Sequence, residues 1–240
     1  MAANTKNKKR DAIITGVPEV DDKLGGGIPL GSLCLIEGDA DSGKSVLCQH
    51  LVNGTLVTGG ASAAYYTTEN SIRSLISQMD SLALHVLDYF LADRFRVYPL
   101  TFHGNMKGGN KPFYVLTHHF AHLPKEFKLI IVDSITLLVA HSNPVAIIDF
   151  FSRCKNLCDD GATIILVAHS YAFEEDLLSR TRSLCDARFR LRLEQVGDRM
   201  IKLMEVLKVR GAERPTGDVV SFDIEPKLGM RIIPLAKARV

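Results

Sequence analysis

Short apolar runs alternate along the first three quarters of the chain with segments whose apolar residues recur every three or four positions. Each run has four to seven residues, the length of a strand buried within a parallel sheet. The runs lie at residues 33–37, 63–68, 95–99, 129–132 and 162–168. Helices are predicted between them over residues 43–57, from Ile72 onward, and from Pro144 to about Cys158. This alternation predicts an α/β fold with a mainly parallel central sheet flanked by helices.

The pattern changes after Leu184, where single apolar residues begin to alternate with polar ones. A period of two is typical of strands with one buried face, and Gly197 and Asp198 form a turn signal between the first two runs. The alternating or apolar runs lie at residues 187–193, 200–209, 219–224 and 231–234. We therefore expect antiparallel C-terminal strands that extend one edge of the sheet.

The charge of the chain is nearly balanced but unevenly placed. With 29 basic and 27 acidic residues among 240, the net charge is +2, which disfavours a strongly basic nucleic-acid binder. Four basic residues and no acidic one fall within residues 1–10. We expect a mobile basic head over residues 1–12 and, because no linker composition follows, a single domain over residues 13–240.

Several signals concern the compartment in which the protein works. No run approaches 18 apolar residues, and the basic N-terminus lacks the apolar core of a secretory signal. The five cysteines are scattered and form no CxxC pair. This pattern is typical of reduced core thiols, so we expect a cytoplasmic protein.

The strongest motif fits G-x-x-x-x-G-K-[ST], between a predicted strand and a predicted helix. It consists of Gly38, Asp39, Ala40, Asp41, Ser42, Gly43, Lys44 and Ser45, and the helix continues with Val46. Small residues let backbone N–H groups converge on phosphate oxygens, and the helix N-terminus adds partial positive charge. Lys44 is expected to reach the β- and γ-phosphates of a nucleotide, and Ser45 to ligate Mg²⁺. Asp39 and Asp41 are unexpected in an anion-binding loop and must point outward or toward a neighbour.

Three further polar residues follow predicted strands at what should be the same sheet edge. Asp133 ends an apolar strand and is expected to hold Mg²⁺ through water. Because Ser134 follows it, a second carboxylate must come from elsewhere, and Glu69 is the candidate base that orients water. Alternatively, Glu69 caps the helix that begins near Asn70. His169 is a candidate γ-phosphate sensor, and a satisfied structural histidine is an equal alternative.

These features together resemble the RecA/KaiC family of P-loop ATPases over nearly the whole chain. Besides the phosphate loop, Asp133, Glu69 and the antiparallel tail, the resemblance rests on several short stretches. They are residues 15–18 with 24–29, residues 43–49, residues 208–211, and residues 216–218 with 222–224. Within the family, the last three stretches resemble the accessory ATP-binding proteins of the archaellum, the archaeal swimming motor.

The resemblance implies a function that the residues alone do not show. It implies ATP and Mg²⁺ as cofactors, a homo-oligomeric ring (a hexamer), and docking on the motor ATPase and the polytopic membrane platform. It also implies weak or absent autonomous hydrolysis. Lys208 and Arg210 match the family positions that contact the nucleotide of the adjacent subunit, whereas the plainer interpretation is a basic strand end at the surface.

Two other functions stay open at the level of sequence. A KaiC-like signalling ATPase or autokinase would use Glu69 as its base. A recombinase paralogue would bind DNA through residues 171–182, which contain Arg180 and Arg182 but also three acidic residues. We expect nucleic-acid binding least, because these acids cancel the basic charge.

Overall fold

The computed structural model describes residues 12–101, 111–197 and 199–233. Nine strands form one sheet in the order β11-β10-β9-β8-β3-β7-β6-β4-β5, and β1 and β2 form a separate ribbon. The strands are β1 (Ala12–Ile13), β2 (Ile28–Pro29), β3 (Leu33–Gly38), β4 (Ser62–Thr67), β5 (Phe95–Pro99), β6 (Phe127–Asp133), β7 (Thr163–His169), β8 (Ala187–Val196), β9 (Arg199–Val209), β10 (Val219–Glu225) and β11 (Gly229–Ile232). All five apolar runs of the first part of the chain are strands of this sheet, as predicted.

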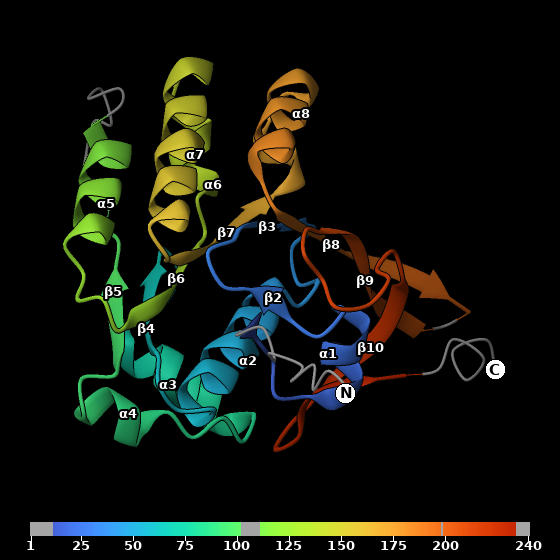
Figure 1. Ribbon diagram of the computed structural model, residues 1–240. Coiled ribbons are helices and arrows are strands. Elements are labelled where there is room, and N and C mark those ends of the chain that lie inside the picture. The colour runs from blue at the N-terminus through green and yellow to red at the C-terminus, as the bar shows by residue number, and fades with distance from the viewer. Residues whose placement is uncertain (1–11, 102–110, 198, 234–240) are drawn as a thin grey trace, which may run out of the picture.

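Helices cover both faces of the sheet, which gives three layers (Figure 1). They are α1 (Pro18–Lys23), α2 (Lys44–Val57), α3 (Ile72–Ser81), α4 (Leu87–Leu91), α5 (Lys111–Ala121), α6 (Thr136–Ala140), α7 (Pro144–Asp159) and α8 (Glu175–Leu184), with a short 3-10 turn at Ser170–Ala172. Helices α1 to α4 pack on one face and α5 to α8 on the other, so the core consists of two apolar layers separated by the sheet. The mainly parallel α/β fold is confirmed.

Parallel pairing brings several strand ends to one edge. Strand β3 lies between β7 and β8, and Gly38 at its end pairs with His169 of β7. On the other side of β7, strand β6 ends at Asp133, which pairs with Thr67 at the end of β4. The carboxyl ends of these parallel strands form the edge where ligands bind in open α/β sheets.

The C-terminal strands are antiparallel among themselves, but their junction with the core is not. Strands β8, β9, β10 and β11 pair antiparallel in succession, whereas β8 pairs parallel with β3. Alternation along β8 reports which residues are buried but not the direction of its partner. The expectation of antiparallel C-terminal strands that extend one edge is confirmed, and β8 joins them to the core through its parallel pairing with β3.

The segment considered as a DNA-binding loop has a different structure. Most of residues 171–182 belongs to the 3-10 turn and to α8. Arg182 is not free for a ligand, because its Nε and Nη2 atoms donate to the two carboxylate oxygens of the buried Glu37 at 3.1 and 2.8 Å. The DNA-loop interpretation is therefore wrong for Arg182.

The basic head at residues 1–12 falls outside the described residues, except for Ala12 in β1. Of the glycine-rich stretch at residues 103–111, only Lys111 is described, at the start of α5. All five cysteines are buried free thiols, and burial raises the pKa of Cys34 and Cys48 well above the ordinary thiol value. In the described part of the chain, no helix combines the length and apolar character needed to cross a bilayer.

Candidate nucleotide-binding site

The phosphate loop leaves β3 at Gly38 and enters α2 at Lys44. Gly38 is required because a Cβ atom there would overlap with the carbonyl oxygen of Leu191 on β8. Gly43 precedes α2 with a φ of +95°, a conformation that side-chain-bearing residues rarely adopt. The two glycines of the motif thus permit the tight passage from strand to helix that places the N-terminus of α2 at the sheet edge.

Lys44 folds back onto its own loop. Its ammonium donates to the carbonyl oxygens of Gly38, at 3.3 Å, and Asp39. Burial lowers the pKa of Lys44, and the charges of Asp133, Asp39 and Glu69 oppose this shift. The ammonium is held mainly by neutral carbonyls, so an anion placed in the loop would gain a nearby cation that is poorly hydrated.

Asp133 is fixed by a residue that the motif analysis did not identify. The hydroxyl of Tyr65, on β4, donates to Oδ2 of Asp133 at 2.6 Å, and both residues are buried. Burial and the Asp133 carboxylate raise the pKa of Tyr65 well above its ordinary value, which keeps the hydroxyl a donor. The sequence indicates this contact only by the presence of a tyrosine in β4, and that tyrosine becomes informative only when β4 and β6 are known to be neighbours.

Hydroxyl groups connect the strand ends around Asp133. Thr68 Oγ1 accepts a hydrogen bond from the Ser134 amide at 3.2 Å, and the Ser134 hydroxyl donates to Thr136 Oγ1 at 3.2 Å. Thr136 Oγ1 also accepts from the amide of His169 at 3.0 Å. These bonds tie the ends of β4, β6 and β7 together and hold the edge of the site in one arrangement.

The loop, Asp133, Glu69 and His169 line one cleft of about 500 Å³. The structure therefore brings together the phosphate-loop residues and the three strand-end residues that the sequence predicted. Asn70, Gln78 and Ile224 also line this cleft and were not predicted. Ile224 and its neighbour Phe222 lie against Gly43, so the C-terminal strand β10 covers the start of α2. This contact between β10 and Gly43 joins segments about 180 residues apart, so it could not be predicted from local sequence.

Glu69 follows β4 and is exposed at the edge of the cleft. The alternative that it caps the next helix is wrong, because Ser71 is the N-cap of α3 and its side chain accepts from the Ser74 amide. Glu69 is thus available to the cleft, and its role as a water-orienting base stays a prediction.

One ring nitrogen of His169 is buried without a hydrogen bond in the described part of the chain. Its Nδ1 atom is buried and has no hydrogen-bond partner among the described residues, although its ring lies 5.2 Å from that of Tyr171. Burial, followed by the charge of Lys44, lowers the pKa of His169, so the ring is neutral at neutral pH. An orphaned ring nitrogen beside the phosphate loop fits a ligand-sensing role better than that of a satisfied structural histidine.

Lys208 and Arg210 do not join this cleft. Lys208 Nζ donates to the carbonyl oxygen of Cys185 at 2.6 Å, and the Arg210 guanidinium lies 3.5 Å from Asp186. Lys208 pairs with Arg188, which is level with Leu35, and its ammonium reaches back to Cys185. Arg210 lies level with the start of β3, because its amide donates to Asp186 and the Asp186 amide donates to Leu33. Five residues of strand separate this level from Gly38, a distance of ~17 Å.

The residues of the cleft fit a nucleotide with Mg²⁺. Ser45 and Asp133 provide hydroxyl and carboxylate oxygens, which are the donors that Mg²⁺ prefers. The buried ammonium of Lys44 and the amides at the start of α2 suit phosphate oxygens.

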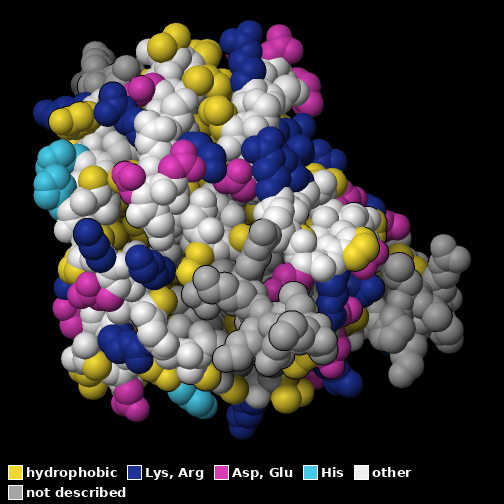
Figure 2. All heavy atoms as spheres, in the orientation of Figure 1, with side chains coloured by type: hydrophobic (Ala, Val, Ile, Leu, Met, Phe, Trp, Pro, Cys, Tyr) yellow, Lys and Arg dark blue, Asp and Glu magenta, His cyan; other side chains and the backbone are white. Residues whose placement is uncertain are grey.

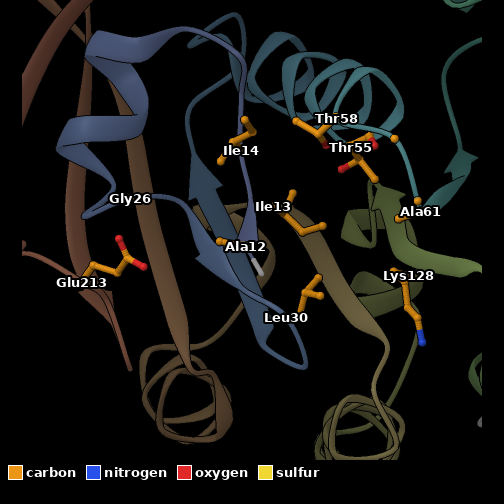
Figure 3. A pocket seen from close by; sticks show the side chains of 12 residues that line it. Ala12, Ile13, Ile14, Gly26, Leu30, Thr55, Thr58, Ala61, Lys128 and Glu213 are labelled. Carbon is orange, nitrogen blue, oxygen red and sulfur yellow. Dashed lines mark hydrogen bonds between the residues drawn. The ribbon is translucent and has the colours of Figure 1, made fainter. Parts of the chain in front are cut away.

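A second cleft, of about 450 Å³, lies at the opposite end of α2 (Figure 3). Its floor is apolar, with Ile13, Ile14 and Leu30 among the lining residues. The hydroxyls of Thr55 and Thr58 donate hydrogen bonds to carbonyl oxygens within α2 itself. Lys128 and Glu213 are the charged lining residues, and the cleft lies at the C-terminal end of α2, where the partial negative charge of the helix suits a phosphate less than the N-terminal end does.

A tyrosine-to-phenylalanine change tests how Asp133 is held. In Tyr65→Phe, we expect the affinity for Mg·ATP to fall several-fold while affinity for ATP without Mg²⁺ changes less, because Asp133 loses its orienting donor. Calorimetric titrations with and without Mg²⁺ measure the difference. Tyr66→Phe is the matched control, since the Tyr66 hydroxyl bonds to His119 Nδ1 instead. Equal behaviour of the two variants would contradict the role given to Tyr65.

The fold and the site define the chain as a P-loop protein of the RecA/KaiC type. A family model described as ATPase: KaiC matches residues 13–237. The archaeal flagellar ATP-binding protein FlaH of Sulfolobus acidocaldarius is 30% identical over 230 residues, which cover 95% of this chain and 99% of that protein. FlaH of Methanocaldococcus jannaschii is 31% identical over 218 residues, covering 89% of this chain and 91% of that protein. The chain belongs to the KaiC family of ATPases, within the group of archaeal flagellar ATP-binding proteins FlaH.

Solved structures give the same result. The crystal structure of the flagellar accessory protein FlaH from Methanocaldococcus jannaschii matches with a TM-score of 0.81 at 28% identity, covering 92% of this chain and 98% of that one. A KaiC-like protein from Pyrococcus horikoshii matches with a TM-score of 0.73 over 93% of this chain and 99% of that one. At 16% identity, this second likeness concerns the fold alone.

Proposed function

We propose that this protein is an ATP-binding regulatory and assembly component of the archaellum motor complex. The observation that carries the proposal is the division of charged groups between two sheet edges. Lys44, Ser45 and Asp133 line a cleft at the carboxyl edge, whereas Lys208 and Arg210 lie at the opposite edge. A site split in this way needs two copies of the chain to be complete. The names of the FlaH relatives support the association with the archaellum.

Within one subunit, the loop residues bind the nucleotide. Lys44 leaves its own carbonyl partners and turns toward the β- and γ-phosphates, while the α2 amides receive phosphate oxygens. Ser45 ligates Mg²⁺ directly and Asp133 does so through water, with Tyr65 holding the carboxylate. ATP with its Mg²⁺ supplies a polyanion that both subunits can contact. His169, with its free Nδ1, senses the γ-phosphate.

Between subunits, Lys208 and Arg210 complete the site. Arg210 lies ~17 Å from its own phosphate loop, and the Lys208 ammonium is held by the Cys185 carbonyl away from that loop, on an edge that can meet the loop of the next copy. Such a head-to-tail contact closes into a ring when its rotation permits, and we propose a hexamer. ATP favours the ring because its phosphates add negative charge where the cations of one copy face the phosphate loop of the next.

The ring acts through its partners. We propose that it docks on the motor ATPase and the polytopic membrane platform, and that the protein is cytoplasmic and reaches the membrane only through them. Hydrolysis by the isolated protein is weak or absent, because Ser134 rather than a second carboxylate follows Asp133, and Glu69 is exposed.

The second candidate function is a KaiC-like signalling ATPase or autokinase. It is favoured by one observation, which is that Glu69 lines the same cleft as Lys44 and Asp133. The two functions differ in turnover. Steady phosphate release by the purified wild type that falls sharply in Glu69→Gln would favour the ATPase, whereas release near background in both proteins favours the assembly function. A DNA-binding recombinase is disfavoured by the pairing of Arg182 with Glu37.

Loss of ATP-dependent assembly in Arg210→Ala tests the split site. We expect Mg·ATP to raise the mean mass of the wild type several-fold by light scattering, and to leave the mass of Arg210→Ala close to that of one chain. The reason is that the γ-phosphate would face no guanidinium from the next copy. Arg153→Ala is the control, because Arg153 forms a surface pair with Asp149 on α7. A mass unaffected by ATP in the wild type, or equal assembly of both variants, would overturn the proposal.

A further inference from the structure

Two acidic residues of the phosphate loop have no function in the site described so far. Asp39 and Asp41 are both exposed, and neither forms an ion pair with any residue in the described parts of the chain. Asp39 forms hydrogen bonds through its backbone, whose carbonyl accepts from Lys44 and Ser42 and whose amide donates to Leu191, while its carboxylate acts on Lys44 through charge. Two unpaired carboxylates beside a phosphate site repel the phosphates, so within one subunit they oppose nucleotide binding.

The opposite edge of the sheet carries an excess of positive charge. We call Lys155, Lys208 and Arg210, which surround Asp186, the cationic edge. Lys155 Nζ lies 2.8 Å from Asp186, whose Oδ2 atom also accepts from the buried Leu33 amide at 3.0 Å. Arg210 is 3.5 Å from the same carboxylate, and its side chain is 59% exposed. One carboxylate thus faces three cations.

The local charges show that this edge is not neutralised within the subunit. Lys155 also contacts Asp159 at 3.1 Å, which still leaves two acids against three cations. Burial lowers the pKa of Lys208, and the charge of Arg210 lowers it further. Lys155 and Arg210 line an open cleft of about 590 Å³ together with Asp186 and Gly211. Basic side chains gather on the visible face where α8 meets the sheet (Figure 2).

The acidic loop and the cationic edge lie at opposite ends of β3. Asp39 follows Gly38 at the carboxyl end, whereas Arg210 and Asp186 lie level with Leu33 at the amino end. The separation of ~17 Å prevents them from pairing within one molecule. Two complementary patches at opposite edges of one chain are suited to a heterologous contact, in which each copy offers one patch to each neighbour.

We propose that Asp39 and Asp41 of one copy pair with the cationic edge of the next copy, so that the phosphate loop itself is a docking element between subunits. This inference rests on the proposed function, because it concerns the same contact between copies. It names the residues that join the carboxyl edge of one copy to the cationic edge of the next, next to the bound nucleotide. The acids are retained in an anion-binding loop because they direct the loop toward the partner's cations. They weaken nucleotide binding by a single chain and favour the assembled state.

If Asp39 and Asp41 repel the nucleotide within one chain but attract the next copy, one double variant should strengthen nucleotide binding and weaken assembly. In Asp39→Asn/Asp41→Asn, we expect Mg·ATP to bind the dilute single chain a few-fold more tightly, because like charges beside the phosphates are removed. We expect assembly at saturating Mg·ATP to need about tenfold more protein, because interfacial ion pairs are lost. Calorimetry measures the first quantity, and light scattering over a protein concentration series measures the second. Raising the salt concentration should weaken assembly of the wild type more than that of the variant.

Asp88→Asn/Asp149→Asn is the matched control, since it removes two exposed acids on α4 and α7. It should assemble like the wild type. If Asp39→Asn/Asp41→Asn assembles as well as the wild type or better, the acids are solvent-facing only and the inference is wrong, while the proposed function stands. If the wild type itself gains no mass with Mg·ATP, both the proposed ring and this inference are overturned.

Discussion

Lys44→Ala is expected to lower the affinity for Mg·ATP at least about 100-fold, which corresponds to about 2.7 kcal/mol. Lys44 is a buried cation of the phosphate loop, 6% exposed and bonded only to the loop carbonyls of Gly38 and Asp39. Alanine removes the charge-assisted hydrogen bonds that the ammonium would make to phosphate. Calorimetric titration with Mg·ATP measures the affinity, and ATP-dependent assembly should disappear at the same time.

The free Lys44→Ala protein should remain folded. Burial lowers the pKa of Lys44, so at neutral pH the folded protein holds an ammonium that is less favourable there than in the unfolded chain. Removing that charge does not remove folding energy, and thermal unfolding without nucleotide should show a cooperative transition. Lys125→Ala, at an exposed position, is the control for loss of one positive charge. ATP affinity within threefold of the wild type in Lys44→Ala would contradict the assignment of the loop.

Glu37→Gln is expected to destabilise the fold by about 3–5 kcal/mol, the cost of removing one partner from a buried ion pair. Glu37 is 1% exposed and lies directly before the phosphate loop. Its carboxylate receives two hydrogen bonds from Arg182 of α8 and lies 3.5 Å from Arg188 of β8. Glutamine keeps the shape but leaves the largely buried Arg188 without this carboxylate and Arg182 with only the exposed Glu175 as an acidic partner. The melting temperature should fall by roughly 6–20 °C.

Glu175→Gln is a closely matched control for Glu37→Gln. Glu175 contacts the same guanidinium of Arg182, at 3.5 Å, but its side chain is 83% exposed. Exposed pairs contribute little, so this variant should lose less than about 1 kcal/mol in chemical denaturation. Equal losses in the two variants would mean that burial of Glu37 does not decide the strength of the ion pair.

Much of the carboxyl-edge site was predictable from local sequence. The phosphate loop is contiguous, and its glycines and Lys44 have fixed roles in the turn from strand to helix. Asp133, Glu69 and His169 were predictable because each follows an apolar run, and parallel strands end at one edge. Periodicity also predicted the strands and the principal helices, since the spacing of apolar residues reports burial directly.

Other parts of the site depend on contacts between distant segments. The bond from Tyr65 to Asp133 requires β4 and β6 to be neighbours, and Ile224 reaches the loop only because β10 folds back over α2. Alternation along β8 could not show that it pairs parallel with β3. Strand order is set by packing of the two core layers, which no local pattern encodes.

The sequence by itself determined the fold class and the phosphate loop, because these depend on residues close together in the chain. Only the tertiary structure decided where Lys208 and Arg210 lie relative to that loop. It placed them at the far end of β3, because β8 and β9 run beside the strand rather than around its carboxyl edge. That separation keeps Arg210 away from the phosphate loop of its own chain.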